Sequence, residues 1–438
     1  MESTPMQCGY QDTSQRFHVD EIDRSFTREE STRFYETRYR CLKSRVLKEA
    51  RKVYGQELES TPLSELISLT PTFVSGILKK VPRRQQSDFR KVLKSCSIED
   101  AEHDSTDIFA HLPATCYNKL FIENDVRRLE LDGNVEQKHL VGGYVVGLFG
   151  EMSEDGKRFT VERLFFPELP TSVPWPRLEK DIYVMFLSDL GLKHRTGLNA
   201  SILWTMLQLF DWLEKEDKRI GRVIFAGNTF KYSTNDFGDE EDRFTSSYDH
   251  VSTVYEQAGW IFARLAKYAD GIDLIPGLHD DVWPCWPQIP LKKTSFGRFG
   301  NASFFHTKTN PYSFTIDGIH FLGTSGQNLT DLRKYTYGQS VEKLMMQMIE
   351  ASHICPTSPK TIDEYSFEDR DPFVLDEIPH VFFAGNQDRH FCKTVEFENG
   401  ARTILLTIPR FQDNCEVVLL NIRTMRTERL RLSLPPSL

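Results

Sequence analysis

The sequence predicts an α/β plus β fold, in which a small curled β-barrel precedes a layered α/β domain. Between residues 63 and 168, short apolar segments alternate with turn residues, as in an all-β domain. The Pro-rich stretch PELPTSVPWPRLEK ends this pattern, and from residue 181 strand-like and helix-like segments alternate. The change of period predicts a second domain over residues 180–438.

The β-rich stretch at residues 63–168 has the strand number and curvature of an OB-fold. TFVSGILKKV is predicted to be its first strand, and LVGGYVVGLFGEMSEDGKRFTVERLFF a hairpin that turns at Asp155-Gly156. Gly142, Gly143, Gly147 and Gly150 indicate bulges or tight curvature. OB-folds can bind oligonucleotides on aromatic platforms. The spacing here instead favours barrel core for Phe73, Phe121, Phe149, Phe159, Phe165 and Phe166.

The N-terminal part is predicted to be a flexible segment, residues 1–24, followed by a helical segment, residues 25–62. Thr27 and Glu30 have capping-box spacing, and Gly55 is a natural end for the helix. One apolar stripe is formed by Tyr35, Tyr39, Leu42, Val46, Ala50 and Val53. The basic residues are predicted to form a solvated face, with nucleic-acid contact as the weaker alternative: Arg38, Arg40, Lys43, Arg45, Lys48 and Arg51.

Composition indicates a globular chain of 438 residues with a net charge of -9. This charge argues against a strong independent DNA-binding domain. No apolar run is long enough to cross a bilayer, and the N-terminus lacks the features of a secretory signal. The eight cysteines include no C-x-x-C pair, so we expect free thiols, no zinc or iron–sulfur site in this chain, and a nuclear or cytosolic location. KKVPRR at 79–84 is either a short localisation signal or a charged loop.

Polar residues follow the predicted strands of the second domain, one strand after another. The strand ends lead into the stretches SD, AGN, PGLHDD, GTSG and AGNQD. In open α/β sheets, ligands bind beyond the carboxyl ends of the strands. The candidate site residues are therefore Asp189, Asn228, His279, Asp280, Ser325, Asn386 and Asp388.

This order of motifs resembles the calcineurin-like metallophosphoesterases, whose α/β sandwich holds two metal ions that activate a water. Of the seven ligand positions that the resemblance implies, only Asp189 carries the expected residue. The other six carry Gly191, Asn228, Leu278, Ser325, Asn386 and Asp388. His279 matches the histidine that lies near the phosphate in active members. The resemblance therefore implies a degenerate site, with neither catalytic nor metal-binding residues.

Over residues 24–425 the chain also resembles the B-type regulatory subunits of eukaryotic replicative DNA polymerases, and within them those of polymerase delta. The stretches that carry the resemblance are RSFTREESTRFYETRY, NPYSFTIDGIHFLGTSGQNLTDL, ASHICPTSPKT and DPFVLDEIPHVFFAGN. It implies a nuclear scaffold in DNA replication and repair. Its partners would be the cysteine-rich C-terminal module of the catalytic subunit, which would hold any iron–sulfur cluster or zinc, and a third subunit.

Three alternatives stay open beside this interpretation. One is an active metal-dependent phosphodiesterase or nuclease, which the changed ligand positions disfavour. Another is the B-type regulatory chain of a different replicative polymerase, which would be larger. The third is a free-standing single-strand-binding module, which would bind oligonucleotides in a salt-sensitive way.

Overall fold

The computed structural model of the chain describes residues 8–20, 31–82, 117–124, 127–136, 139–193, 200–231, 247–336, 338–367 and 369–434. These residues form two compact units, each assembled from separate stretches of the chain. The sandwich unit comprises residues 1–20, 172–327 and 378–438. The barrel unit comprises residues 21–171 and 328–377. Residues 328–377, which the sequence analysis assigned to the phosphodiesterase-like domain, thus group with the barrel.

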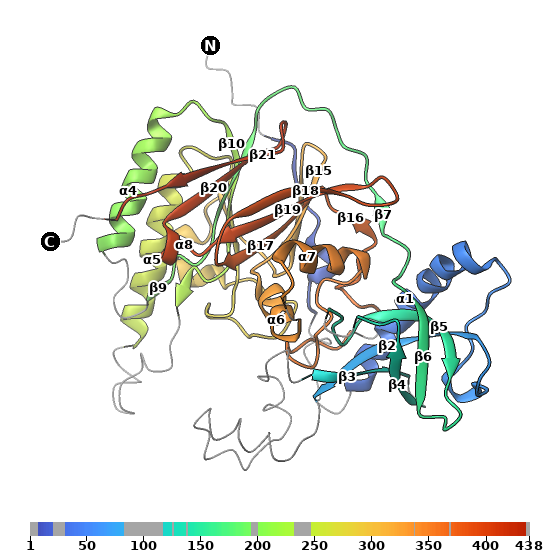
Figure 1. Ribbon diagram of the computed structural model, residues 1–438. Helices are drawn as coiled ribbons and strands as arrows, with labels where there is room; N and C mark the ends of the chain where they lie inside the picture. The colour runs from blue at the N-terminus through green and yellow to red at the C-terminus, as the bar shows by residue number, and fades with distance from the viewer. Residues whose placement is uncertain are drawn as a thin grey trace. The chain divides into compact units, whose positions relative to one another are not determined.

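The sandwich unit consists of two six-stranded sheets packed face to face (Figure 1). One sheet has the order β1-β14-β15-β17-β19-β18 and the other β13-β12-β10-β8-β20-β21. Strands β8, β10, β12 and β13 run parallel, as do β15, β17 and β19. Buried apolar side chains of both sheets interdigitate between them, and the rings of Phe186 and Phe383 lie 5.1 Å apart.

The bounds of the elements in these sheets and their short neighbours are as follows: β1 (Tyr10–Asp12), β8 (Tyr183–Leu187), β9 (Leu192–Lys193), β10 (Ile220–Ala226), β11 (Phe230–Lys231), β12 (Ile272–Ile275), β13 (Phe305–Thr307), β14 (Tyr312–Ile316), β15 (Ile319–Thr324), β17 (Val381–Gln387), β18 (Phe391–Glu396), β19 (Arg402–Pro409), β20 (Glu416–Asn421) and β21 (Arg426–Arg431).

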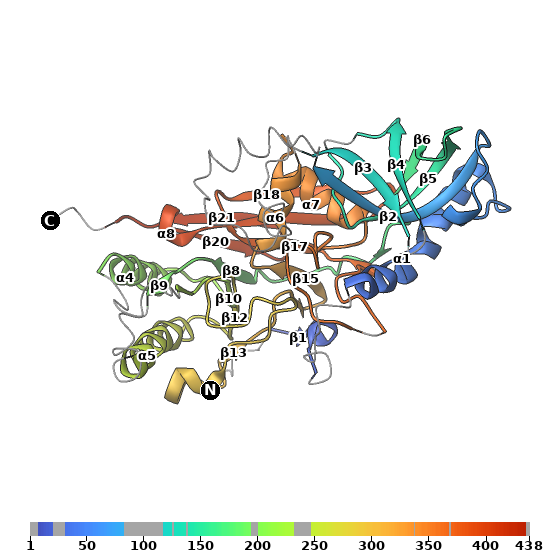
Figure 2. The same ribbon diagram turned by 90° about the horizontal axis from the view of Figure 1, so that it is seen from below.

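Two helices cover the outer face of the β8-containing sheet (Figure 2). Helix α4 (Ala200–Lys215) and helix α5 (Ser247–Leu265) follow the predicted periods at 199–215 and 248–270. Their apolar stripes pack on Met185, Val223 and Phe225. The unit also contains 3-10 turns at Ser14–Phe17 and Lys293–Phe299, and the short helix α8 (Phe411–Asn414).

The barrel unit contains a closed five-stranded barrel of order β2-β3-β4-β6-β5. Strand β2 pairs with both β3 and β5 and so closes the barrel. The predicted hairpin turn at Asp155-Gly156 is present, and the register shifts at Phe149/Gly150 as expected for a bulge. Phe73, Phe159 and Phe165 are buried, as predicted for core residues. The bounds are β2 (Thr72–Pro82), β3 (Tyr117–Glu123), β4 (Arg128–Gly133), β5 (Val145–Met152) and β6 (Arg158–Phe165).

Helix α1 (Ser31–Tyr54) packs on the barrel through Leu42, Val46 and Ala50. Two details differ from the prediction. Val53 is 46% exposed and does not extend the apolar stripe. Arg38, assigned to the solvated basic face, is fully buried because it lies one helical turn before Leu42, on the packed face. The predicted capping box at Thr27 and Glu30 lies outside the described residues.

The other elements within the described residues are short. They are the 3-10 turn Leu63–Glu65, β7 (Thr171–Ser172), α6 (Gln327–Tyr335), α7 (Val341–Glu350) and β16 (Glu377–Ile378). Helix α7 matches the helix that the sequence predicts over about residues 340–352, whereas α6 lies in the stretch FLGTSGQNLTDL, for which the resemblance to the phosphoesterases implies a loop. The six cysteines within the described ranges are all free, as expected. No helix in these ranges is long and apolar enough to cross a membrane.

The expectation of a flexible N-terminus does not hold for residues 8–20. Strand β1 pairs with β14, and Tyr10 shares a hydrogen bond of 2.8 Å with the hydroxyl of Tyr312. The guanidinium of Arg222 lies 3.8 Å from the centre of the Tyr10 ring. A polar segment is ordered here because an open sheet edge offers it backbone partners.

We expect Tyr10→Phe to lower the free energy of unfolding by about 1 kcal/mol, since it removes a partly buried hydrogen bond. Chemical denaturation of the full chain measures this change. Tyr268→Phe, at a half-buried tyrosine of the same unit, is the control and should have a smaller effect. Equal losses in the two variants would show that the Tyr10 hydroxyl does not anchor β1.

Candidate functional site

The predicted site residues meet where the parallel strands of both sheets end. We use the term strand-end site for Asp189, Gly191, Asn228, Leu278, His279, Asp280, Ser325, Asn386 and Asp388. Backbone hydrogen bonds join the loops that carry these residues. The Asp189 N–H donates to the Gly227 carbonyl at 2.9 Å, and the Gly191 N–H donates to the Asn228 carbonyl at 3.1 Å. The Asn386 side chain donates to the Ser325 carbonyl at 2.7 Å. Neighbouring parallel strands ending at one edge bring these loops together.

Three of these residues have a left-handed backbone. The φ angles are 54° at Asp189, 55° at Asn228 and 55° at Asn386. Asp and Asn adopt this conformation more readily than other non-glycine residues, because their short polar side chains bond locally. Each strand therefore leads into a sharp turn that positions its polar side chain at the edge.

Asp280 is buried and binds the protein's own backbone. Its Oδ2 accepts from the N–H groups of Asn228 at 2.8 Å and Gly277 at 2.7 Å, and its Oδ1 from the N–H of Phe230 at 2.7 Å. Burial is the main cause that raises its pKa, to about 7, and these three bonds oppose the rise. The carboxyl group thus ties the loop after β12 to the loop after β10.

The rest of the GLHD loop is held by Asn228. Its Oδ1 accepts from the backbone N–H of His279 at 3.0 Å. Gly277 is required there, because a Cβ at this position would lie 2.4 Å from that oxygen. The Leu278 side chain is 57% exposed. The loop therefore contributes backbone donors to this contact.

Amide side chains link the strand-end site to a residue that the sequence analysis missed. Ser325 Oγ accepts from Asn310 Nδ2 at 2.7 Å, and Asn310 Oδ1 accepts from the Ser325 N–H at 3.0 Å. Asn310 also donates to the side-chain oxygen of Gln288 at 2.7 Å. Asn386 donates to the Ala226 carbonyl at 3.2 Å as well as to Ser325. The NH2 groups of Asn310 and Asn386 thus bond to groups of the protein itself, whereas the buried Oδ1 of Asn386 has no hydrogen-bond partner.

A second missed group follows strand β19. Gln412 donates to Asp189 Oδ1 at 3.2 Å, and a Cβ at Gly191 would lie 1.4 Å from the Gln412 amide nitrogen. The Gln412 side chain thus occupies the space that any side chain at position 191 would need. Burial raises the pKa of Asp189, and the charge of Asp413 adds to this shift.

The last predicted residue, Asp388, is paired with a cation. Arg410 donates to Asp388 at 2.8 Å and to Asp413 at 2.6 Å. Arg410 and Gln412 could have been found by the rule that identified the other site residues, since they also follow directly after a buried strand. In the described ranges, no three His, Cys, Asp or Glu side chains form a group that could hold a metal ion.

Comparison with known proteins identifies the class. A family model that describes the B-type subunits of DNA polymerases alpha and epsilon matches residues 184–393. A second, described as "DNA polymerase delta subunit OB-fold domain", matches residues 32–164 and confirms the predicted OB-fold. The chain is therefore built as a B-type subunit of a DNA polymerase, in which the OB-fold match precedes the B-subunit match along the sequence.

The most similar curated proteins include small subunits of DNA polymerase delta. The DNA polymerase delta small subunit of Arabidopsis thaliana is 33% identical over 325 residues, which cover 72% of this chain and 73% of that protein. DNA polymerase delta subunit 2 of Drosophila melanogaster is 29% identical, with 72% and 74% covered. The DNA polymerase II small subunit of Methanothermobacter thermautotrophicus is 23% identical, with 57% and 52% covered. The chain belongs to the family of DNA polymerase delta small subunits, which are accessory subunits.

Proposed function

We propose that this accessory subunit is a non-catalytic scaffold that bridges two partners within DNA polymerase delta. One partner is the cysteine-rich C-terminal module of the catalytic subunit, and the other is the third subunit. The observation that carries the proposal is the strand-end site. Asp280, the NH2 group of Asn386 and Gln412 bond to groups of the protein itself, whereas the buried Oδ1 of Asn386 has no hydrogen-bond partner.

The donor set does not fit the two metal ions of an active phosphodiesterase. Metal ions of this kind need deprotonated oxygen or imidazole ligands aimed at a common point. Asp280 instead faces three N–H groups, and Asn386 and Gln412 present N–H donors. We therefore propose an inactive calcineurin-like sandwich with no cofactor of its own; any iron–sulfur cluster or zinc would belong to the catalytic partner.

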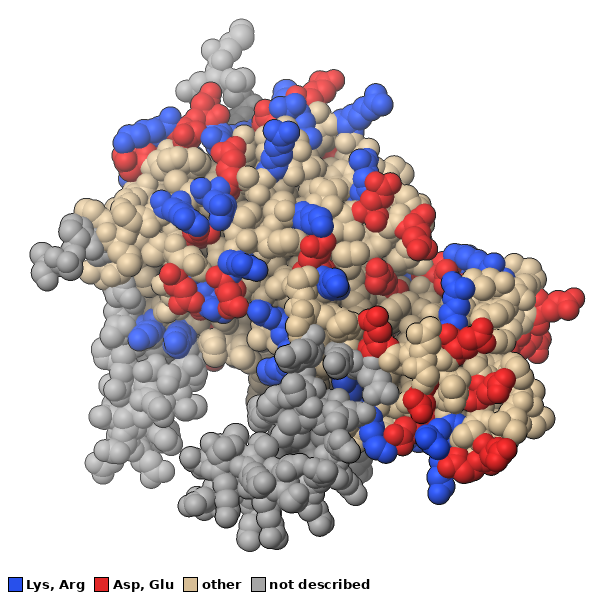
Figure 3. All heavy atoms as spheres, viewed as in Figure 1, with Lys and Arg blue, Asp and Glu red and all other residues tan. Residues whose placement is uncertain are grey.

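Surface charge supports protein partners over independent DNA binding. Lys and Arg side chains are interspersed with Asp and Glu on the face seen in Figure 3. The net charge of -9 suits a basic protein partner better than a phosphate backbone. We propose a nuclear location, as part of the replication and repair machinery, with only indirect contact to DNA.

The test begins with the subunit purified from its own cells together with its partners. We expect the polymerase delta catalytic subunit to co-purify, and metal analysis after separation to find no tightly bound ion on this chain. Manganese-dependent hydrolysis of a phosphodiester should be absent from wild type, Asp189→Ala and the control Asp281→Ala alike. Hydrolysis that Asp189→Ala abolishes and Asp281→Ala preserves would overturn the non-catalytic assignment, and purification without a catalytic subunit would overturn the scaffold.

A further inference from the structure

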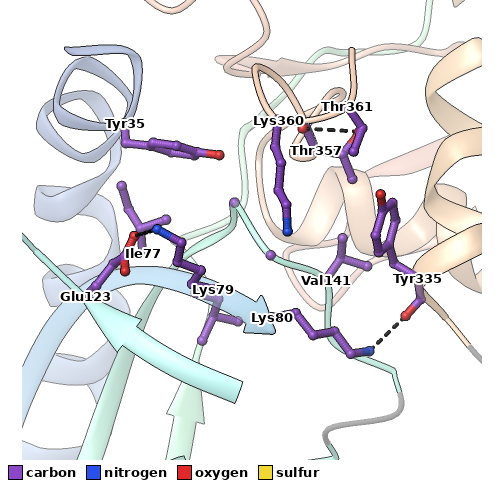
Figure 4. Close-up of a pocket in the computed structure, with 13 residues that line it drawn as sticks. Tyr35, Ile77, Lys79, Lys80, Glu123, Val141, Tyr335, Thr357, Lys360 and Thr361 are labelled. Atoms are coloured by element: carbon purple, nitrogen blue, oxygen red, sulfur yellow. Dashed lines mark hydrogen bonds and ion pairs between the residues drawn. The ribbon is translucent and has the colours of Figure 1, made fainter. Parts of the chain in front are cut away.

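The barrel unit contains an open pocket that is separate from the strand-end site (Figure 4). Its volume is about 440 Å³, which includes open solvent. It lies between strand β2, the turn at residues 356–361 and the end of α6. Three lysines and one glutamate line it: Lys79, Lys80, Lys360 and Glu123. Lys79 and Lys80 begin the KKVPRR stretch. They belong to a paired strand, so they do not form the exposed charged loop considered from sequence.

Of the two lysines on strand β2, Lys79 is paired with a carboxylate, and Lys80 is bound to backbone carbonyls. Lys79 forms an ion pair of 2.7 Å with Glu123, and Arg128 lies 3.7 Å from the same carboxylate. Lys80 is only 4% exposed and donates to the backbone carbonyls of Leu140 and Tyr335 at 3.0 and 2.8 Å. Burial lowers its pKa to about 8. One carboxylate thus faces several cations around this pocket.

Lys360 has no partner among the described residues. Its side chain extends into the hollow between Tyr35 and Tyr335 (Figure 4). Burial lowers its pKa and the positive charges of Lys79 and Arg128 lower it further, while the carboxylates of Glu123 and Asp331 partly oppose the shift. A desolvated ammonium group among like charges is unfavourable unless an anion is bound nearby.

A hydroxyl without a partner lies on the same turn. Thr357 lines the pocket, is only 6% exposed, and its Oγ1 makes no hydrogen bond. Buried polar atoms are nearly always hydrogen-bonded, so an orphan atom in a pocket calls for a ligand. The Tyr35 hydroxyl points into the same hollow (Figure 4), and burial, which raises its pKa to about 12, keeps it a neutral donor.

We propose that this pocket binds the phosphate group of a small phosphorylated ligand, with Lys360, Thr357 and Tyr35 as its donors. The donors come from helix α1 and from the turn at residues 356–361 and line one pocket. An ammonium group beside neutral hydroxyl donors suits the charged oxygens of a phosphate. A single nucleic-acid strand would instead require a groove with a row of cations and stacking aromatics. Inorganic pyrophosphate, which DNA synthesis releases, is the probe of choice.

Calorimetric titration of the full chain with pyrophosphate tests the site. We expect saturable binding that Lys360→Gln weakens at least about tenfold, because it removes the one unpaired charge. Thr357→Val should weaken binding less, and without ligand it should unfold at the same or a higher temperature than wild type, since the orphan hydroxyl is gone. Lys267→Gln, at an exposed lysine of the sandwich unit, is the matched control and should bind as wild type does.

Two results would overturn the proposal. Equal affinity in Lys360→Gln and Lys267→Gln, or no binding below about 1 mM, would remove the site. Binding of an oligothymidylate that Lys360→Gln weakens, with no binding of pyrophosphate, would show that the phosphate belongs to a nucleic-acid strand. A thermal midpoint of Lys360→Gln at or above that of wild type shows that the variant is folded.

Discussion

Replacing Arg38 with alanine is expected to destabilise the barrel unit by about 3–5 kcal/mol, the cost of leaving buried carboxylates without their cation. Arg38 donates to Asp371 at 2.9 Å, lies 3.6 Å from Glu364, and binds the carbonyls of Gly143, Pro356 and Ser358. Burial opposes the ionisation of Asp371, but Arg38 and the hydrogen bond with His353 hold its pKa below its usual range. Burial raises the pKa of Glu364 to about 8, and the charge of Asp371 adds to this shift. The Arg38 side chain thus links helix α1 to the barrel and to residues 356–371 by hydrogen bonds.

Amide hydrogen exchange resolved by peptide measures this effect where it occurs. We expect faster exchange in α1 and in residues 353–371 of Arg38→Ala, and no change in strands β8 and β10 of the sandwich unit. Lys43→Ala, at an exposed position of the same helix, should change stability by less than about 0.5 kcal/mol. Equal effects of the two substitutions would contradict the prediction.

A second variant isolates the electrostatic cause. Arg38→Met combined with Asp371→Asn should lose less stability than the sum of the single variants, because the neutral amide is no longer a stranded charge. An additive loss would show that Arg38 contributes through packing alone.

Replacing Asp280 with alanine is expected to cost at least about 3 kcal/mol, because three buried N–H groups lose their acceptor at about 1–3 kcal/mol each. Asp280→Asn should cost less. Its oxygen can still accept from Asn228 and Gly277, although its NH2 group would face the Phe230 N–H. Asp281→Ala is the matched control, since the neighbouring carboxylate is exposed and should matter little.

Hydrogen exchange of the peptide that covers residues 276–283 provides the local readout. We expect this loop and the loop after β10 to exchange together in Asp280→Ala, because the carboxyl group joins them. Protection unchanged from that of Asp281→Ala would mean that Asp280 does not hold the loop.

Sequence patterns predicted most of the elements because burial imposes a period. The helices α4, α5 and α7, the barrel hairpin and the strand ends follow directly from apolar spacing and turn residues. Arg38 was misplaced because a charged side chain at a buried helical position is visible only through its partners, which lie more than 100 residues away along the chain. Strand β1 was missed because a three-residue polar segment carries no period, and the open edge beside β14 orders it.

The residues of the strand-end site could be predicted from the sequence, but the hydrogen bonds between them could not. Each loop could be located by the strand before it, and the structure joins most of these loops by hydrogen bonds. The direction of Asp280, inward to backbone N–H groups, depends on the loop after β10 and cannot be read from GLHDD alone. Gln412 follows a buried strand and could be located by the same rule, but its contact with Asp189 and the volume that its amide fills above Gly191 are spatial relations that the sequence does not show.

The left-handed turns at Asp189, Asn228 and Asn386 change how acidic residues in such loops should be interpreted. A turn of this kind selects Asp or Asn for its own conformational reasons, whatever ligand lies beyond it. Exchanging one for the other alters charge at little cost to the backbone, so an aspartate found there reports the shape of the chain first. Asp189 by itself therefore does not indicate a metal site, and chemistry should be assigned only from what its oxygens touch.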